Sequence, residues 1–147
     1  MKASPAGQQK GAAAIEFVAV FMVFFAVFYG LVSYALPMLM LQSFNQASSE
    51  AVRRCVAVDP SSQTYELDVQ GLARQVIGQQ LAWMPSALGF NVLTDTRVTV
   101  GVDKVLTVVI DYPRSRLTRV LPTLVLPVVG DVPKLPARLQ AQASLQL

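Results

Sequence analysis

The sequence predicts an α+β protein in which a long N-terminal helix crosses a membrane and leads into a small head with a second helix and an antiparallel sheet. An uncharged apolar run at 17–41 predicts the membrane-crossing part. Near-perfect alternation of apolar and polar residues at 97–102 and 137–147 predicts the strands. The expected organisation is a leader at 1–11, a long helix at 12–58 with its membrane segment at 17–41, and a head at 59–147.

The composition excludes several classes of protein. Of the 147 residues, 53% are hydrophobic and only 14% are charged, against about 25% charged in typical domains. The 12 basic and 9 acidic residues leave a net charge of +3, which argues against a disordered chain and against nucleic-acid binding. The absence of histidine removes the usual general base and zinc ligand. One cysteine cannot build a cysteine-rich metal site, so we expect no metal and no cofactor.

The apolar run is long enough to span a lipid bilayer. As a helix its 25 residues measure about 37 Å, whereas the hydrocarbon core is about 30 Å thick. Gly30 and Pro37 are tolerated in membrane helices, and we expect them to kink this one. A buried core helix or a cleaved secretory signal would be the alternative. The length of the run and the acidic Glu16 before it disfavour a signal peptide.

The residues before the membrane segment form the most specific motif. A basic leader ends at Gly11, the small residues Ala12 to Ala14 follow, and Glu16 precedes Phe17 and the apolar run. A protease at the membrane surface needs an extended, slim peptide, which a glycine and alanines supply. Cleavage after Gly11 would create an amine at Ala12, four residues from Glu16. In an assembly, that carboxylate could pair with the amine of a neighbouring subunit and offset the desolvation of both groups.

This motif carries a resemblance to a known family. Gly11-Ala-Ala-Ala-Ile-Glu-Phe before a long apolar helix resembles the processing region of type IV prepilins. It is more similar to the TadE-like minor pseudopilins of tight-adherence (Tad, Flp) pilus systems. Residues 108–113, the Leu- and Pro-rich stretch through Pro127 and the alternating C-terminal segment also resemble that family. The chain departs from the pattern by ending in Leu145-Gln146-Leu147, where members often end in a basic-acidic pair.

The resemblance implies a processed, pilin-like protein of the bacterial inner membrane. A prepilin peptidase would cut between Gly11 and Ala12 on the cytoplasmic side, and Glu16 and Phe17 would act in assembly. The head would be periplasmic, although the numbers of basic residues on the two sides of the apolar run are nearly equal and do not by themselves set the orientation. Implied partners are the major Flp pilin, a TadF-like minor pseudopilin, the inner-membrane assembly platform and the lipid bilayer. The protein would initiate, cap or regulate pilus assembly for adherence, and would not be an enzyme.

Helical patterns continue beyond the membrane segment. We expect the long helix to run to about Val58, where Asp59-Pro60 breaks it. Glu50 lies three and four residues before Arg53 and Arg54, which predicts a surface ion pair. Acidic residues at 66 and 68 favour the start of a second helix. Its apolar stripe repeats at helical spacing over Val69, Leu72, Ala73, Val76 and Ile77.

The rest of the head reads as extended chain. The strand at 97–102 and a buried strand at Val105–Tyr112 flank a turn near Asp103-Lys104, which predicts a hairpin. Prolines 113, 122, 127, 133 and 136 predict edge segments and loops. In the last eleven residues, apolar side chains occupy every second position, which predicts a half-buried antiparallel strand.

Candidate chemistry in the head is sparse. Ser115 lacks a base, and Asp103, Asp111 and Asp131 are typical of turns and strand ends. The arginines at 114, 116 and 119 are best interpreted as a solvated loop, with contact to lipid headgroups or an acidic partner as the alternative. Cys55 either bridges to another subunit or is a buried free thiol. An uncleaved membrane-anchored binding or sensor module is the second function hypothesis, and a membrane-tethered enzyme is a disfavoured third.

Overall fold

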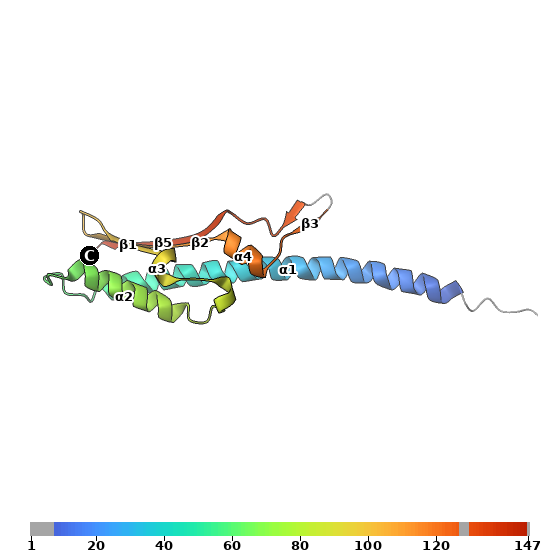
Figure 1. Ribbon diagram of the computed structural model, residues 1–147, viewed down its shortest axis with the longest axis horizontal. Helices are drawn as coiled ribbons and strands as arrows, with labels where there is room; N and C mark the ends of the chain where they lie inside the picture. Colours follow the sequence, from blue (N-terminus) through green and yellow to red (C-terminus); the bar gives the residue numbers. More distant parts are fainter. Residues whose placement is uncertain (1–7, 127–129, 147) are drawn as a thin grey trace, which may run out of the picture.

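The computed structural model describes residues 8–126 and 130–146. One long helix, α1 (Gln8–Cys55), runs along the molecule, and most of the rest of the chain folds against its C-terminal half (Figure 1). The α+β prediction is confirmed. The remaining elements are α2 (Tyr65–Gln80), η1 (Ser86–Leu88), α3 (Val92–Asp95), β1 (Thr96–Val100), β2 (Val105–Pro113), α4 (Arg114–Val120), β3 (Leu124–Leu126), β4 (Gly130–Val132) and β5 (Arg138–Gln146).

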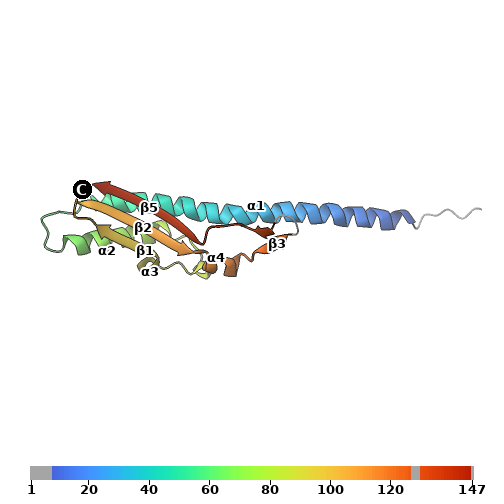
Figure 2. The same ribbon diagram turned by 90° about the horizontal axis from the view of Figure 1, so that it is seen from above.

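The main sheet is antiparallel, with β2 between β1 and β5. Val108 on β2 pairs with Val98 on one side and Ala143 on the other, which sets the register. The sheet contacts α1 through β2 and β5 and contacts α2 through β1, so it forms one layer and the helix pair forms the other (Figures 1 and 2). The predicted hairpin and the C-terminal strand are therefore confirmed.

The core lies between these two layers. Helix α1 contributes the fully buried Met40, Phe44, Ala47, Ala51 and Cys55, spaced three or four residues apart along one face. Helix α2 contributes the predicted stripe, of which Val69, Ala73, Val76 and Ile77 are buried and Leu72 is partly buried. The sheet contributes alternate residues of β2 (Leu106, Val108, Ile110 and Tyr112), together with Val98 of β1 and Leu139 and Ala141 of β5.

Several predicted boundaries differ from the structure. Helix α1 ends at Cys55, not near Val58. The next residues form turns, in which the N–H groups of Ala57 and Val58 donate to the carbonyls of Arg54 and Cys55. At its other end α1 begins at Gln8, so the last residues of the predicted leader are helical. Strand β1 ends at Val100, and Val102 is fully exposed in the turn. Residues 1–7, Pro127 and Leu147 lie outside the described residues.

The proline-rich segment is not extended throughout, and the prediction of edge segments and loops was wrong where α4 forms. Helix α4 follows Pro113 directly, and Leu117 is its only buried residue. A helix of two turns with one buried side chain shows no apolar period, which is why the pattern did not reveal it. Strands β3 and β4 form a second, two-stranded antiparallel sheet.

Candidate functional site

The N-terminal half of α1 is exposed. From residue 11 to residue 32 every residue is exposed except Tyr29 and Gly30, which are half-buried. Among the described residues, α1 is the one helix long and apolar enough to cross a membrane, and its most apolar stretch is not covered by the head. Twenty-two helical residues measure about 33 Å, close to the thickness of a hydrocarbon core. This surface therefore has the length and composition of a single-pass membrane anchor.

The four residues of the predicted processing and assembly motif all lie on this exposed stretch. Gly11, Ala12, Glu16 and Phe17 are exposed, and a side chain at Gly11 would meet no atom within 4 Å. Ala12 and Glu16 are one helical turn apart on the same face. The sequence led us to expect an extended peptide at Gly11, whereas the structure has it in the first turns of α1. Those turns must unwind before a protease can cut them. They are the least stable part of a helix, because its first N–H groups have no hydrogen-bond partner within the helix.

A ladder of aromatic rings follows the motif along α1. The rings of Phe17, Phe21, Phe25 and Tyr29 are stacked at i, i+4 spacing, with centroid distances of 6.1, 6.3 and 6.5 Å. Sequence reasoning did not single out this ladder, although its four-residue spacing is visible in the printed sequence. It gives one side of the exposed helix a continuous aromatic face.

The buried side of α1 begins inside the segment predicted to span the membrane. Ser33, Pro37 and Met40 are buried against the head, so the C-terminal part of 17–41 is covered by protein. The helix continues through both Gly30 and Pro37; the predicted kink stays a prediction. The exposed apolar stretch at 11–32 is thus shifted toward the N-terminus relative to 17–41.

At the other end of α1, Cys55 is buried, Glu50 is half-buried, and Arg53 and Arg54 are exposed. The thiol is free, fully covered by the fold, and lies 3.5 Å from the carbonyl oxygen of Val69 on α2. Burial raises the pKa of Cys55, so the structure favours the buried thiol over the intersubunit bridge. Glu50 accepts hydrogen bonds from Arg53 at 2.8 Å and Arg54 at 2.7 Å. These bonds lower the pKa of Glu50 to about 2, and the predicted surface ion pair is confirmed.

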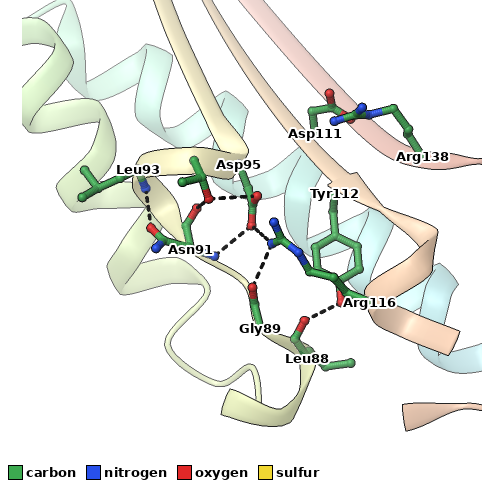
Figure 3. A network of polar contacts seen from close by, with 10 residues as sticks. Leu88, Gly89, Asn91, Leu93, Asp95, Asp111, Tyr112, Arg116 and Arg138 are labelled. Atoms are coloured by element: carbon green, nitrogen blue, oxygen red, sulfur yellow. Dashed lines mark hydrogen bonds and ion pairs between the residues drawn. The ribbon is translucent and has the colours of Figure 1, made fainter. Parts of the chain in front are cut away.

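One arginine of the predicted solvated loop is instead part of a network inside the head (Figure 3). Arg116 on α4 donates to Asp95 at 2.6 Å and to the carbonyl of Gly89 at 2.9 Å. Asp95 is 4% exposed and also accepts from the backbone N–H of Asn91. Gly89 has a φ of 63°, a conformation that favours glycine. The solvated-loop prediction was wrong for Arg116, because its partner lies 21 residues away and is brought near only by the fold.

The same network anchors β2. The hydroxyl of Tyr112 donates to the carbonyl oxygen of Leu88 at 2.6 Å, and burial raises the pKa of Tyr112. The guanidinium of Arg116 lies 5.9 Å from the centre of the Tyr112 ring. These contacts join α4, β2 and η1, so their role is to hold the head together.

The remaining candidate residues do not converge. Asp111 on β2 accepts from Arg138 on β5 at 2.6 Å, whereas Asp131 lies on β4 and Asp103 in the β1–β2 turn. Arg114 donates to the carbonyl of Leu135 at 2.7 Å, and Ser115 is exposed on α4. Within residues 8–126 and 130–146, no three His, Cys, Asp or Glu side chains are grouped so as to hold a metal.

Comparison with known proteins identifies a family for part of the chain. The family model described as TadE-like protein matches residues 11–53, which begins at Gly11 and covers the exposed motif, the aromatic ladder and most of the buried side of α1. The family resemblance predicted from the sequence is confirmed over this range. No curated protein and no solved structure matches the chain.

Proposed function

The chain is TadE-like over residues 11–53, and on this premise we propose that it is a minor pseudopilin that helps to assemble or initiate Tad (Flp) pili for adherence. The family match itself indicates a protein associated with Tad pili. The proposed role in assembly rests on one observation: the matched segment begins at Gly11, on the exposed half of α1.

In this proposal the exposed half of α1 anchors the protein in the bacterial inner membrane. A helix satisfies all its backbone hydrogen bonds internally, which a single segment crossing lipid must do. The 11–32 stretch supports this role because most of its apolar side chains are exposed; Phe24, for example, is 63% exposed. The N-terminus is proposed to be cytoplasmic and the head periplasmic.

A prepilin peptidase is proposed to cut between Gly11 and Ala12 before assembly. The new amine at Ala12 would lie on the same helical face as Glu16, one turn away. Both groups sit where desolvation is expensive, since an acid inside a bilayer costs about 2.5–3.5 kcal/mol at the centre and less near the edge. Pairing the carboxylate of one subunit with the amine of the next offsets both penalties and sets the axial position of neighbouring helices.

The head is proposed to make lateral contacts with the major Flp pilin, a TadF-like minor pseudopilin and the inner-membrane platform. Its polar contacts favour a structural role over a catalytic one: Asp95 is paired with Arg116, and Asp111 is paired with Arg138. The alternative is an uncleaved membrane-anchored binding or sensor module. The helical conformation at Gly11 is the observation that favours this alternative, because a helix must unwind before it is cut.

Replacing Glu16 with glutamine tests the assembly role. The Glu16→Gln variant should enter the membrane as well as the unaltered chain, because it removes a charge from an apolar segment. Recovery of other pilus subunits with it, and the number of pili on cells, should fall at least ten-fold, which corresponds to about 1.4 kcal/mol or more of lost interaction.

The matched control is Glu66→Gln, which removes an exposed carboxylate in the first turn of α2, away from the anchor. It should leave pilus numbers unchanged. If Glu16→Gln assembles pili as well as Glu66→Gln does, Glu16 has no role in pairing and the proposed mechanism is wrong.

A further inference from the structure

We propose that the β3–β4 hairpin is a second membrane contact, which lies in the interfacial layer of the head-side leaflet next to α1. This inference rests on the proposed anchoring of α1 in a bilayer. The hairpin would be a membrane contact in addition to α1. It lies outside the family match, which ends at residue 53.

The hairpin is attached to α1 on both sides of residue 32, where the exposed stretch ends. Just before β3, the carbonyl of Pro122 accepts a hydrogen bond from the Tyr29 hydroxyl. Just after β4, the backbone N–H of Lys134 donates to the hydroxyl of Tyr34 at 2.9 Å. Both views show β3 alongside α1 on the N-terminal side of α4 (Figures 1 and 2). Two tyrosines of α1 thus hold the two ends of the hairpin.

Between these two bonds, one face of the hairpin is directed at the aromatic ladder. Leu124 and Val132 are paired across the two strands and line a groove with α1. The residues that α1 contributes to this groove are Val18, Phe21, Met22, Phe25, Ala26 and Tyr29. The groove therefore brings the hairpin next to the stretch of α1 that is proposed to be in the membrane.

The positions of the tyrosines set the depth of the hairpin. Tyrosine side chains favour the membrane–water interface, where the ring is in apolar and the hydroxyl in polar surroundings. Gly11 and Tyr29 are 18 residues apart, or about 27 Å, so the two ends of the exposed stretch reach opposite sides of a hydrocarbon core. Val125 is three residues beyond Pro122, at most about 10 Å further toward the N-terminal end of α1. That distance matches the depth of about 5–10 Å that interfacial segments reach.

The side chains on the outer face fit an interfacial position and not a deeper one. Val125 is 75% exposed, and Val120 and Leu124 before it are also exposed, with no charged residue from 120 to 126. The charged side chains of Arg119 and Lys134 flank the segment and are exposed, as suits contact with lipid phosphates. Asp131 is paired with Val125 in the register. Its carboxylate, and the unpaired edges of a two-stranded sheet, require water nearby, which the interfacial layer provides.

Fluorescence quenching in vesicles tests this position. The full chain carrying Trp83→Phe is reconstituted into phosphatidylethanolamine–phosphatidylglycerol vesicles with and without bromine atoms on the upper acyl chain. In that background, a tryptophan introduced by Val125→Trp should show a blue-shifted emission, and brominated lipid should reduce its intensity about two-fold. The variant Val102→Trp is the matched control, because Val102 is equally apolar and fully exposed in the β1–β2 turn; brominated lipid should leave its emission unchanged.

A third variant separates failure of this inference from failure of the proposed function. Phe24→Trp introduces the reporter on the exposed stretch of α1, and it should be quenched if α1 is in the bilayer. Quenching of Phe24→Trp without quenching of Val125→Trp would overturn the hairpin contact and leave the anchor intact. A blue shift of Val125→Trp without quenching would also overturn it, because protein and not lipid would then cover the hairpin. If brominated lipid quenches neither Phe24→Trp nor Val125→Trp, the proposed anchoring of α1 in the bilayer is wrong.

Discussion

Replacing Arg116 with methionine should lower the free energy of unfolding of the head by about 3 kcal/mol. The substitution keeps much of the side-chain volume but leaves the carboxylate of Asp95, which is 4% exposed, without its cation. A buried charge that loses its partner is among the most destabilising defects in a folded protein. The measurement is urea unfolding of the full chain in detergent micelles, followed by the fluorescence of Trp83.

The double variant Asp95→Asn with Arg116→Met is the control for this interpretation. It removes the buried charge together with its partner and should recover more than half of the lost stability, because the asparagine can still accept the hydrogen bond from the backbone of Asn91. A single variant that stays within about 0.5 kcal/mol of the unaltered chain, the usual range for surface substitutions, would show that Arg116 acts as a surface residue after all.

Phe44→Ala should destabilise the head by about 3–5 kcal/mol. Phe44 is fully buried on α1, with its ring centroid 5.7 Å from that of Phe90 and 6.1 Å from that of Tyr112. Truncation removes apolar contacts and leaves a cavity where the long helix meets the sheet. The same urea titration measures the effect.

Phe24→Ala is the matched control, since it makes the same change on the same helix at an exposed position. We expect it to leave the unfolding midpoint of the head unchanged. Equal losses in the two variants would mean that the exposed and buried halves of α1 unfold as one cooperative unit in micelles. That result would contradict the division of α1 at residue 33.

The elements that the sequence predicted correctly are those with a repeating pattern. The stripe of α2 has a helical period, and the alternation in β1 and β5 has a period of two, so each could be assigned from its own residues. The family resemblance could be found because the glycine, alanines and acid of the motif at 11–17 are close together in the sequence. The end of α1 was misplaced by only three residues, which is the usual uncertainty of a helix end.

The features that the sequence did not predict depend on contacts between distant residues. Arg116 meets Asp95 only after α4 has packed on η1, and Lys134 meets Tyr34 across 100 residues of chain. Helix α4 and the β3–β4 hairpin are short, so neither shows a period of its own. In the C-terminal part of 17–41 the head covers one side of α1, which the sequence does not reveal. An apolar residue such as Met40 looks the same whether lipid or the head covers it.

The most direct test of the proposed processing uses the chain purified from the membrane fraction of cells that make pili. Its mass and its N-terminal sequence are measured. We predict that the chain stays with the membrane and begins at Ala12, because cleavage after Gly11 creates the amine that Glu16 is proposed to bind. A chain that still begins at Met1 in such cells, or one recovered in the soluble fraction, would contradict it.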